Sequence, residues 1–236
     1  GNDLSIRLIL IFIIFMVNSL RTLYNGGIMK KGLFIVFEGG EKVGKTTQLR
    51  HAKEYLESKG NTVILTHEPG GGDTEIRKKL LDKKSILTPE EELDLFCQDR
   101  ALHVSNIIRP ALTKNNIVLC DRFEFSTIAY QGYGRGMDLT LIKKKSAEAR
   151  RGLQPDKIIL LDADPNVALV REEATSRFDA ESLDFHQRVR NGFLAQAHED
   201  PVHWRIVDAA QPLETVWEEI KKFIDILLKE RENPSL

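Results

Sequence analysis

The sequence has few cysteines, no excess of charge of either sign and no apolar run long enough to cross a membrane. Its 236 residues include two cysteines, Cys97 and Cys120, too far apart to form a metal-ligand pair or the disulfide framework of a small secreted protein. Lysine and arginine number 34 against 35 acidic residues, a formal charge of -1. We expect the two cysteines to be reduced thiols of a cytoplasmic protein. Because no global positive field attracts polyanions, we expect it to bind neither nucleic acid nor membrane.

The longest apolar run, residues 8–17, is shorter than the ~20 residues that a membrane-spanning helix needs. A small-residue cleavage site of the signal-peptide kind is missing before Met29. We therefore expect residues 1–28 to be a non-domain extension, with an upstream start assignment and a cloning remnant at Gly1. The rest, 29–236, is predicted to be a single domain. A membrane-tethered protein is the alternative, and it depends on the 8–17 run alone.

The chain also lacks internal repeats and low-complexity linkers. Instead, short apolar runs alternate with longer amphipathic stretches, which indicates an α/β domain with a parallel sheet of about five strands and helices on both faces. The predicted strands are 33–37, 62–66, 116–120, 157–161 and 204–207. The predicted helices are 45–59, 73–82, 89–113, 123–131, 138–152, 165–199 with a break, and 212–230. Ligands of such sheets bind beyond the carboxyl ends of the strands.

A phosphate-binding loop follows the first predicted strand. Gly39-x4-Gly44-Lys45-Thr46 lies between a strand and a helix, which is the context that this pattern requires. Its backbone N–H groups and the helix N-terminus favour phosphate oxygens. Lys45 is expected to reach the β- and γ-phosphates, and Thr46 to ligate Mg²⁺. The predicted ATP-binding residues are Gly39, Gly40, Glu41, Lys42, Val43, Gly44, Lys45, Thr46 and Thr47.

A second polar pair, Asp121-Arg122, follows the predicted strand 116–120. It should reach the same sheet edge, where Asp121 would approach Mg²⁺ or its waters and Arg122 an anionic substrate oxygen. The alternative is an ion pair that only caps the strand. Since switches, motors and kinases share the phosphate loop, the loop alone does not assign a reaction.

Several stretches in order resemble thymidylate kinases of the bacterial kind, a group of P-loop nucleoside monophosphate kinases. They are "EGGEKVGKTTQ" (38–48), "HEPGG" (67–71), "FCQDRALH" (96–103), "DRFEFSTIAYQGYGRG" (121–136) and "DAAQPLETVWEEI" (208–220). The resemblance implies transfer of the γ-phosphoryl group of Mg-ATP to deoxythymidylate (dTMP), giving the diphosphate. It also implies a homodimer and a short lid around residues 165–181.

The resemblance further implies an acceptor pocket. In such enzymes a phenylalanine at the position of Phe96 stacks on thymine, and an arginine at that of Arg100 donates to a base carbonyl. By the same likeness Thr127 contacts the base edge, Tyr130 packs against the deoxyribose and Glu41 faces the 3′-hydroxyl. Ser126 and Gln131 follow on the same predicted helix. From spacing alone, Phe96 would be a core residue and Arg100 a solvated charge.

Two positions depart from the family pattern. Lys42 stands where one subgroup has a catalytic arginine, and the lid stretch 171–177, "REEATSR", is short and partly acidic. We predict that Lys42 supplies some of the charge that stabilises the transition state, so the predicted catalytic residues are Lys45, Arg122, Lys42, Arg171 and Arg177. His67 replaces an arginine expected to hold the acceptor phosphate, or it only packs the strand end.

Two other functions fit parts of the pattern. Another nucleoside monophosphate kinase would share the phosphate loop but not the combination of Phe96 and Arg100. A nucleotide-dependent switch or ATPase would hydrolyse ATP slowly without an acceptor. The predicted aromatic and arginine residues of an acceptor pocket argue against it.

Overall fold

The computed structural model describes residues 32–171 and 176–232. The predicted extension, 1–28, lies outside these residues, as does the middle of the predicted lid. No helix within the described ranges has the length and apolar character needed to cross a membrane.

Five parallel strands form one sheet in the order β2-β3-β1-β4-β5. Their bounds are β1 Leu33–Gly39, β2 Val63–His67, β3 Ile117–Asp121, β4 Lys157–Asp162 and β5 Trp204–Asp208. Each predicted strand is present to within one or two residues. The β1 strand is buried along its whole length, as a central strand of a doubly covered sheet must be. The predicted fold class is confirmed.

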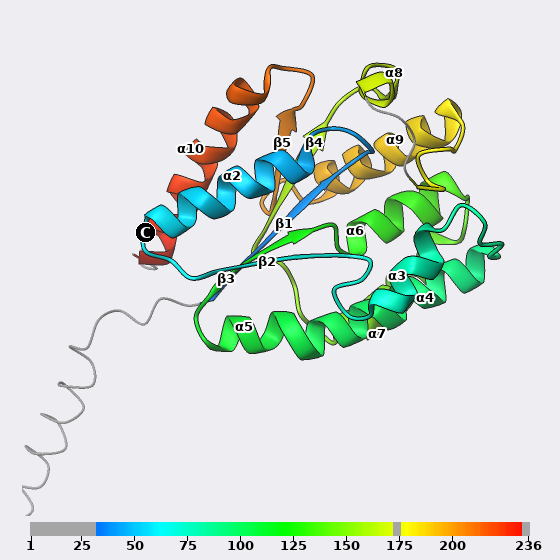
Figure 1. Ribbon diagram of the computed structural model, residues 1–236, viewed down its shortest axis with the longest axis horizontal. Coiled ribbons are helices and arrows are strands. Elements are labelled where there is room, and N and C mark those ends of the chain that lie inside the picture. Colours follow the sequence, from blue (N-terminus) through cyan, green and yellow to red (C-terminus); the bar gives the residue numbers. More distant parts are fainter. Residues whose placement is uncertain (1–31, 172–175, 233–236) are drawn as a thin grey trace, which may run out of the picture.

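Helices cover both faces of the sheet (Figure 1). The helices are α2 Lys45–Ser58, α3 Thr74–Leu81, α4 Pro89–His103, α5 Arg109–Thr113, α6 Glu124–Thr127, α7 Leu139–Arg150, α8 Pro165–Ala168, α9 Leu183–Glu199 and α10 Leu213–Glu232, with short turns η1 Val104–Ile108, η2 Ile128–Gly134 and η3 Leu169–Arg171. One apolar cluster joins α2 and α10 to the sheet, and a second joins the opposite face to α5, α6 and α9.

The predicted helix 89–113 is interrupted in the structure. Helix α4 begins at a capping box, in which Thr88 accepts from the backbone of Glu91 and the Glu91 carboxylate accepts from Thr88 N–H. The wide turn η1 separates it from α5, whose first turn contains Pro110. Proline has no N–H and its ring crowds the preceding turn, so a regular helix cannot pass through it without widening or bending.

The carboxyl ends of three strands are aligned in one row. Asp121 at the end of β3 pairs in register with Phe37 of β1 and with His67 of β2. The loops that follow these strands therefore start side by side. This alignment places the phosphate loop, the "EPGG" loop and the Asp121-Arg122 turn at one sheet edge.

Candidate active site

The phosphate loop connects β1 to α2. Gly39 has a φ of 144°, and a Cβ there would lie 2.5 Å from the carbonyl oxygen of Leu161. Gly44, with a φ of 86°, is the residue before α2. A side chain would clash at Gly39, and a positive φ strains any residue with a Cβ, so both positions favour glycine. The Lys45 ammonium is buried and donates to the Gly40 carbonyl at 2.8 Å. Burial and the nearby Arg122 lower the pKa of Lys45.

Two cationic residues of the site, Lys42 and Arg122, have left-handed backbones, with φ of 58° and 69°. Such conformations cost a non-glycine residue of order 1–3 kcal/mol and persist where the surroundings enforce them. Lys42 Nζ donates to the carbonyl of Leu169 in η3, at 3.0 Å. The lysine therefore links the phosphate loop to the start of the predicted lid.

Arg122 contacts the phosphate loop directly. Its Nη1 donates to the Gly39 carbonyl at 2.8 Å and to Ser126 Oγ at 3.1 Å, and its Nη2 lies 3.1 Å from Glu41 Oε1. The guanidinium also lies over the Tyr130 ring, 5.1 Å from its centroid. Arg122 therefore lies between the phosphate loop and the α6–η2 segment, and it does not merely cap a strand.

Glu41 and Tyr130 form a pair at the centre of the site. The Tyr130 hydroxyl donates to Glu41 Oε1 at 2.6 Å. Burial disfavours the Glu41 carboxylate, but the charges of Arg122 and Lys45 outweigh this and lower its pKa. Glu41 is therefore an anion at neutral pH, held between two cations and a phenol. Its predicted contact with a sugar hydroxyl stays a prediction.

Glu38, near the end of β1, has a completely buried carboxyl group. Its oxygens accept from the backbone N–H groups of Phe123 and Ser126, at 2.8 and 3.2 Å, and from Ser126 Oγ at 2.6 Å. Complete burial raises the pKa of Glu38 to about 7, although Arg122 acts in the opposite direction. Glu38 holds the turn that carries Arg122.

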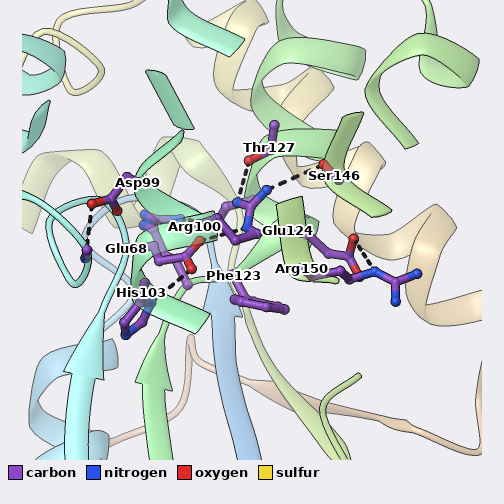
Figure 2. Close-up of polar contacts among 12 residues, drawn as sticks. Glu68, Asp99, Arg100, His103, Phe123, Glu124, Thr127, Ser146 and Arg150 are labelled. Carbon is purple, nitrogen blue, oxygen red and sulfur yellow. Dashed lines mark hydrogen bonds and ion pairs between the residues drawn. The ribbon is translucent and has the colours of Figure 1, made fainter. Parts of the chain in front are cut away.

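The acceptor side is built around Arg100, which is 1% exposed (Figure 2). Its Nε donates to Glu68 Oε2 at 2.9 Å, its Nη2 to Thr127 Oγ1 at 2.8 Å and its Nη1 to Ser146 Oγ at 3.4 Å. The other Glu68 oxygen, Oε1, lies 2.9 Å from His103 Nδ1. A single buried carboxylate thus fixes two side chains of α4, and Arg100 is neither solvated nor freely mobile.

Asp99 fixes the loop after β2. Its carboxylate accepts from the backbone N–H groups of Gly70, Gly72 and Asp73, at 2.7 to 3.0 Å. A Cβ at Gly72 would lie 2.1 Å from the Asp99 carbonyl oxygen, so the loop approaches α4 too closely for any larger residue. Figure 2 shows Asp99 on the opposite side of Glu68 from Thr127.

A cavity of about 910 Å³ joins these parts. Its volume suits small-molecule substrates. It brings together most residues that the sequence predicted for the site: Glu41, Lys42, Val43, Gly44, Lys45, Thr46, Thr47, His67, Phe96, Arg100, Asp121, Arg122, Ser126, Thr127, Tyr130 and Gln131. Donor-side and acceptor-side residues thus line one continuous space.

Of the two predicted lid arginines, the structure describes the side chain of Arg177 alone. The side chain of Arg171 is outside the part of the chain that the structure describes. Arg177 does not line the cavity: its Nε donates to the Leu80 carbonyl at 2.6 Å and its Nη2 to the Glu92 carboxylate. Its catalytic role stays a prediction.

The residues predicted to hold a metal, Thr46 and Asp121, both line the cavity. Asp121 Oδ1 is buried and has no hydrogen-bond partner. A buried carboxylate oxygen without a partner is costly, and a hydrated cation would satisfy it. The donor set therefore fits Mg²⁺. The described residues contain no cluster of three or more histidine, cysteine, aspartate or glutamate side chains suited to a metal.

His67 lies at the exposed end of β2 and lines the cavity. The surrounding protein and the positive charge of Arg77 lower its pKa below the ordinary value. Arg77 itself lines the cavity and donates to the Pro69 carbonyl at 2.5 Å. At the position where the family pattern has an arginine, this chain therefore has His67, whose imidazole is neutral at pH 7, with Arg77 nearby.

Sequence reasoning gave no role to Glu38, Glu68, Glu92, Asp99 and His103, although all five are buried. One signal was available for the last two: Asp99 and His103 are four residues apart on a predicted helix, so they share a face. Their partners come from other strands and loops, and no spacing along the chain reports those contacts.

Comparisons with known proteins agree with this geometry. Residues 37–220 match the family model described as thymidylate kinase. The chain is 46% identical over 208 residues to the thymidylate kinase of Gloeobacter violaceus, covering 85% of this chain and 98% of the relative. It is 43% identical over 212 residues to that of Desulfovibrio desulfuricans, covering 84% and 98%.

The fold is also similar to a solved structure. The crystal structure of thymidylate kinase from Ehrlichia chaffeensis superimposes with a TM-score of 0.70 at 34% identity, covering 82% of this chain and 99% of that one. The family match covers the phosphate loop, the Asp121-Arg122 turn and the residues of α4 that face the cavity. The chain therefore belongs to the thymidylate kinase family.

Proposed function

We propose that this protein transfers the γ-phosphoryl group of ATP to the 5′-phosphate of dTMP, giving the diphosphate. The observation that carries this is the continuous cavity, in which the phosphate loop faces Phe96, Arg100 and Tyr130. An ATPase or switch needs the phosphate loop but not the pocket around Phe96, Arg100 and Tyr130. Other nucleoside monophosphate kinases need a second pocket too, and the family match favours dTMP over their substrates.

The protein groups act by positioning and by charge. The acceptor phosphate already carries the attacking oxygen, so the protein must bring two polyanions together and offset their repulsion. Lys45 and Arg122 approach the same two carbonyls of the phosphate loop and both line the cavity, which supports this role for them. Mg²⁺, when bound near Thr46 and Asp121, would neutralise charge on the phosphates.

Lys42 is proposed to add positive charge from the phosphate loop, and Arg171 from the lid. The Lys42 bond to Leu169 supports this, because it keeps the ammonium between loop and lid. Lysine lacks the two-pronged geometry of arginine, so a Lys42→Arg variant should keep or raise turnover while Lys42→Ala lowers kcat. Unchanged kcat in Lys42→Ala would refute this role.

Glu41, Phe96, Arg100, Thr127 and Tyr130 are proposed to bind the nucleoside. Tyr130 is fixed by Glu41 and packed by Arg122, so its ring can fill the space of a 2′-hydroxyl. Arg100 is fixed by Glu68 with its Nη2 on Thr127, so both side chains are set for one base edge. Ser126, Gln131 and His67 complete the proposed acceptor side.

We also propose a cytoplasmic homodimer. Leu102 on α4 and Ile107 on η1 are both more than a third exposed, which supports an interface there. Light scattering after size exclusion measures the mass directly, and a monomer at micromolar concentration would contradict the dimer.

The function is tested by coupled ADP release with Mg-ATP. The acceptors to compare are dTMP, deoxyuridylate, deoxycytidylate, deoxyguanylate and none. ADP release that depends strongly on dTMP is expected. Equal release with and without every acceptor would make the protein an ATPase or switch.

A further inference from the structure

Glu92 on α4 is a buried carboxylate that lines no part of the cavity and has no role in the mechanism above. It is 1% exposed, yet it carries a carboxylate surrounded by donors. Gln131 Nε2 donates to its Oε1 at 2.6 Å, Arg135 Nε lies 3.4 Å from the same oxygen, and Arg177 Nη2 donates to Oε2. Burying a charge is costly unless ion pairs and hydrogen bonds offset the lost hydration, and here three side chains contact the carboxylate.

The partners of Glu92 adjoin the acceptor part of the cavity. Gln131 lines the cavity itself, and Arg177 immediately precedes Phe178, which also lines it. Arg177 is held a second time by the Leu80 carbonyl at the end of α3. The guanidinium is thus fixed between α3 and α4 and is not among the residues that line the cavity.

The ring of Phe178 is fixed by the same arrangement. It is 5% exposed and lies edge-on to Tyr130, with centroids 5.6 Å apart, and tilted against Phe96 at 6.2 Å. The guanidinium carbons of Arg177 and Arg135 lie 4.7 and 5.9 Å from its centroid. Both arginines that pack on Phe178 are therefore bound to Glu92.

Glu92, Phe96 and Arg100 follow each other at intervals of four, so they lie along one face of α4. Phe96 and Arg100 line the cavity, and Glu92 is one turn before them. One face of α4 therefore carries Phe96, which is predicted to stack on the base, and Glu92, which contacts Gln131 and Arg177.

We propose that Glu92 is a positioning residue for the acceptor nucleotide, which holds Gln131 and the Arg177-Phe178 pair as adjoining walls of the pocket around Phe96. This assigns Arg177 an anchoring role in place of the transition-state role predicted from the sequence. The inference rests on the proposed function, because it requires that the acceptor occupy this end of the cavity.

The test is steady-state kinetics of Glu92→Gln with Mg-ATP and dTMP. Removing the charge weakens the contact with Gln131 and leaves Arg177 with the Leu80 carbonyl and Arg135 with Glu181, so the KM for dTMP should rise about tenfold while kcat and the KM for ATP change less than about threefold. Glu90→Gln is the matched control, since Glu90 is an exposed glutamate of the same helix. It should equal the wild type. Thermal unfolding of each variant is recorded in parallel.

Arg177→Met is the second variant, and it decides the question even if Glu92→Gln does not fold. An anchoring arginine predicts a raised KM for dTMP with kcat retained, and the double variant should be no worse than the worse single one. A fall of ~10³ in kcat at unchanged KM would identify a transition-state group and overturn the proposal. So would Glu92→Gln with unchanged KM for dTMP. A wild type without dTMP-dependent ADP release would refute the proposed function instead.

Discussion

The donor side and the acceptor side of the cavity are built in different ways. The donor side is a single stretch, residues 39–47, whose shape follows from two glycines with positive φ and from the helix that starts at Lys45. The acceptor side gathers Glu68, Arg100 and Thr127 from separate segments around buried ion pairs. A continuous loop needs few supporting contacts, whereas a wall assembled from distant segments depends on buried groups that never touch substrate.

Lys45→Met tests the donor side and should have the largest effect. Removing the ammonium that is proposed to reach the β- and γ-phosphates is expected to lower kcat by at least ~10³, with stability little changed. Lys53→Met is the control, because Lys53 is on the same helix, pairs with Glu57 and does not line the cavity. Coupled ADP release measures both. Retention of more than about a tenth of the wild-type kcat would mean that the loop is not the donor site.

Glu68→Gln tests the acceptor side through stability. It leaves the buried Arg100 charge without its counter-ion, so the free energy of unfolding should fall by about 3 kcal/mol, the lower end for such pairs because Thr127 still accepts from Arg100. The surface pair of Lys53 and Glu57 gives the contrast, and Glu57→Gln should cost less than ~1 kcal/mol. Urea unfolding measures both. Equal losses of unfolding free energy in Glu68→Gln and Glu57→Gln would contradict a larger contribution from the buried pair.

Glu38 links the two sides, and its effect depends on pH. Because the folded-state pKa is raised from 4.5 to about 7, the folded protein binds a proton that the unfolded chain releases, and stability falls as pH rises through this window. At ~1.4 kcal/mol per pKa unit, the loss across the whole window from 4.5 to about 7 is roughly 3–4 kcal/mol. Glu38→Gln cannot titrate, so its stability relative to the wild type should rise between pH 5 and 8. A constant difference in urea unfolding would contradict the raised pKa.

His67→Arg should have the smallest effect, on the acceptor phosphate alone. The lowered pKa keeps His67 neutral at pH 7.5, so an arginine there adds a charge and should lower the KM for dTMP by about three- to tenfold. The advantage should shrink at acidic pH, where His67 gains a proton and its own positive charge. His67→Gln is the neutral control. A KM gap that does not change with pH would mean that His67 only packs the strand end.

Prediction from the sequence succeeded where the chemistry is continuous along the chain. The strands, the phosphate loop and the Asp121-Arg122 turn were each read from a local pattern, and the aligned strand ends then bring them together. The helix 89–113 was predicted without its interruption, because the effect of Pro110 on the preceding turn depends on how the helix packs. The ion pair of Arg177 with Glu92 was not predicted, because the two residues are far apart along the chain, and the catalytic role of Arg177 stays a prediction.

The sequence by itself determined the sheet, the phosphate loop and the family, because strand pattern, glycine spacing and residue order are properties of the chain. Only the tertiary structure decided which partner each buried carboxyl group holds. Glu38, Glu68 and Glu92 are ordinary acids in sequence, and each becomes a fixed support only after burial leaves it with specific partners. The physical reason is that a buried charge is stable only with its partner in place, and those partners lie 32 to 88 residues away along the chain.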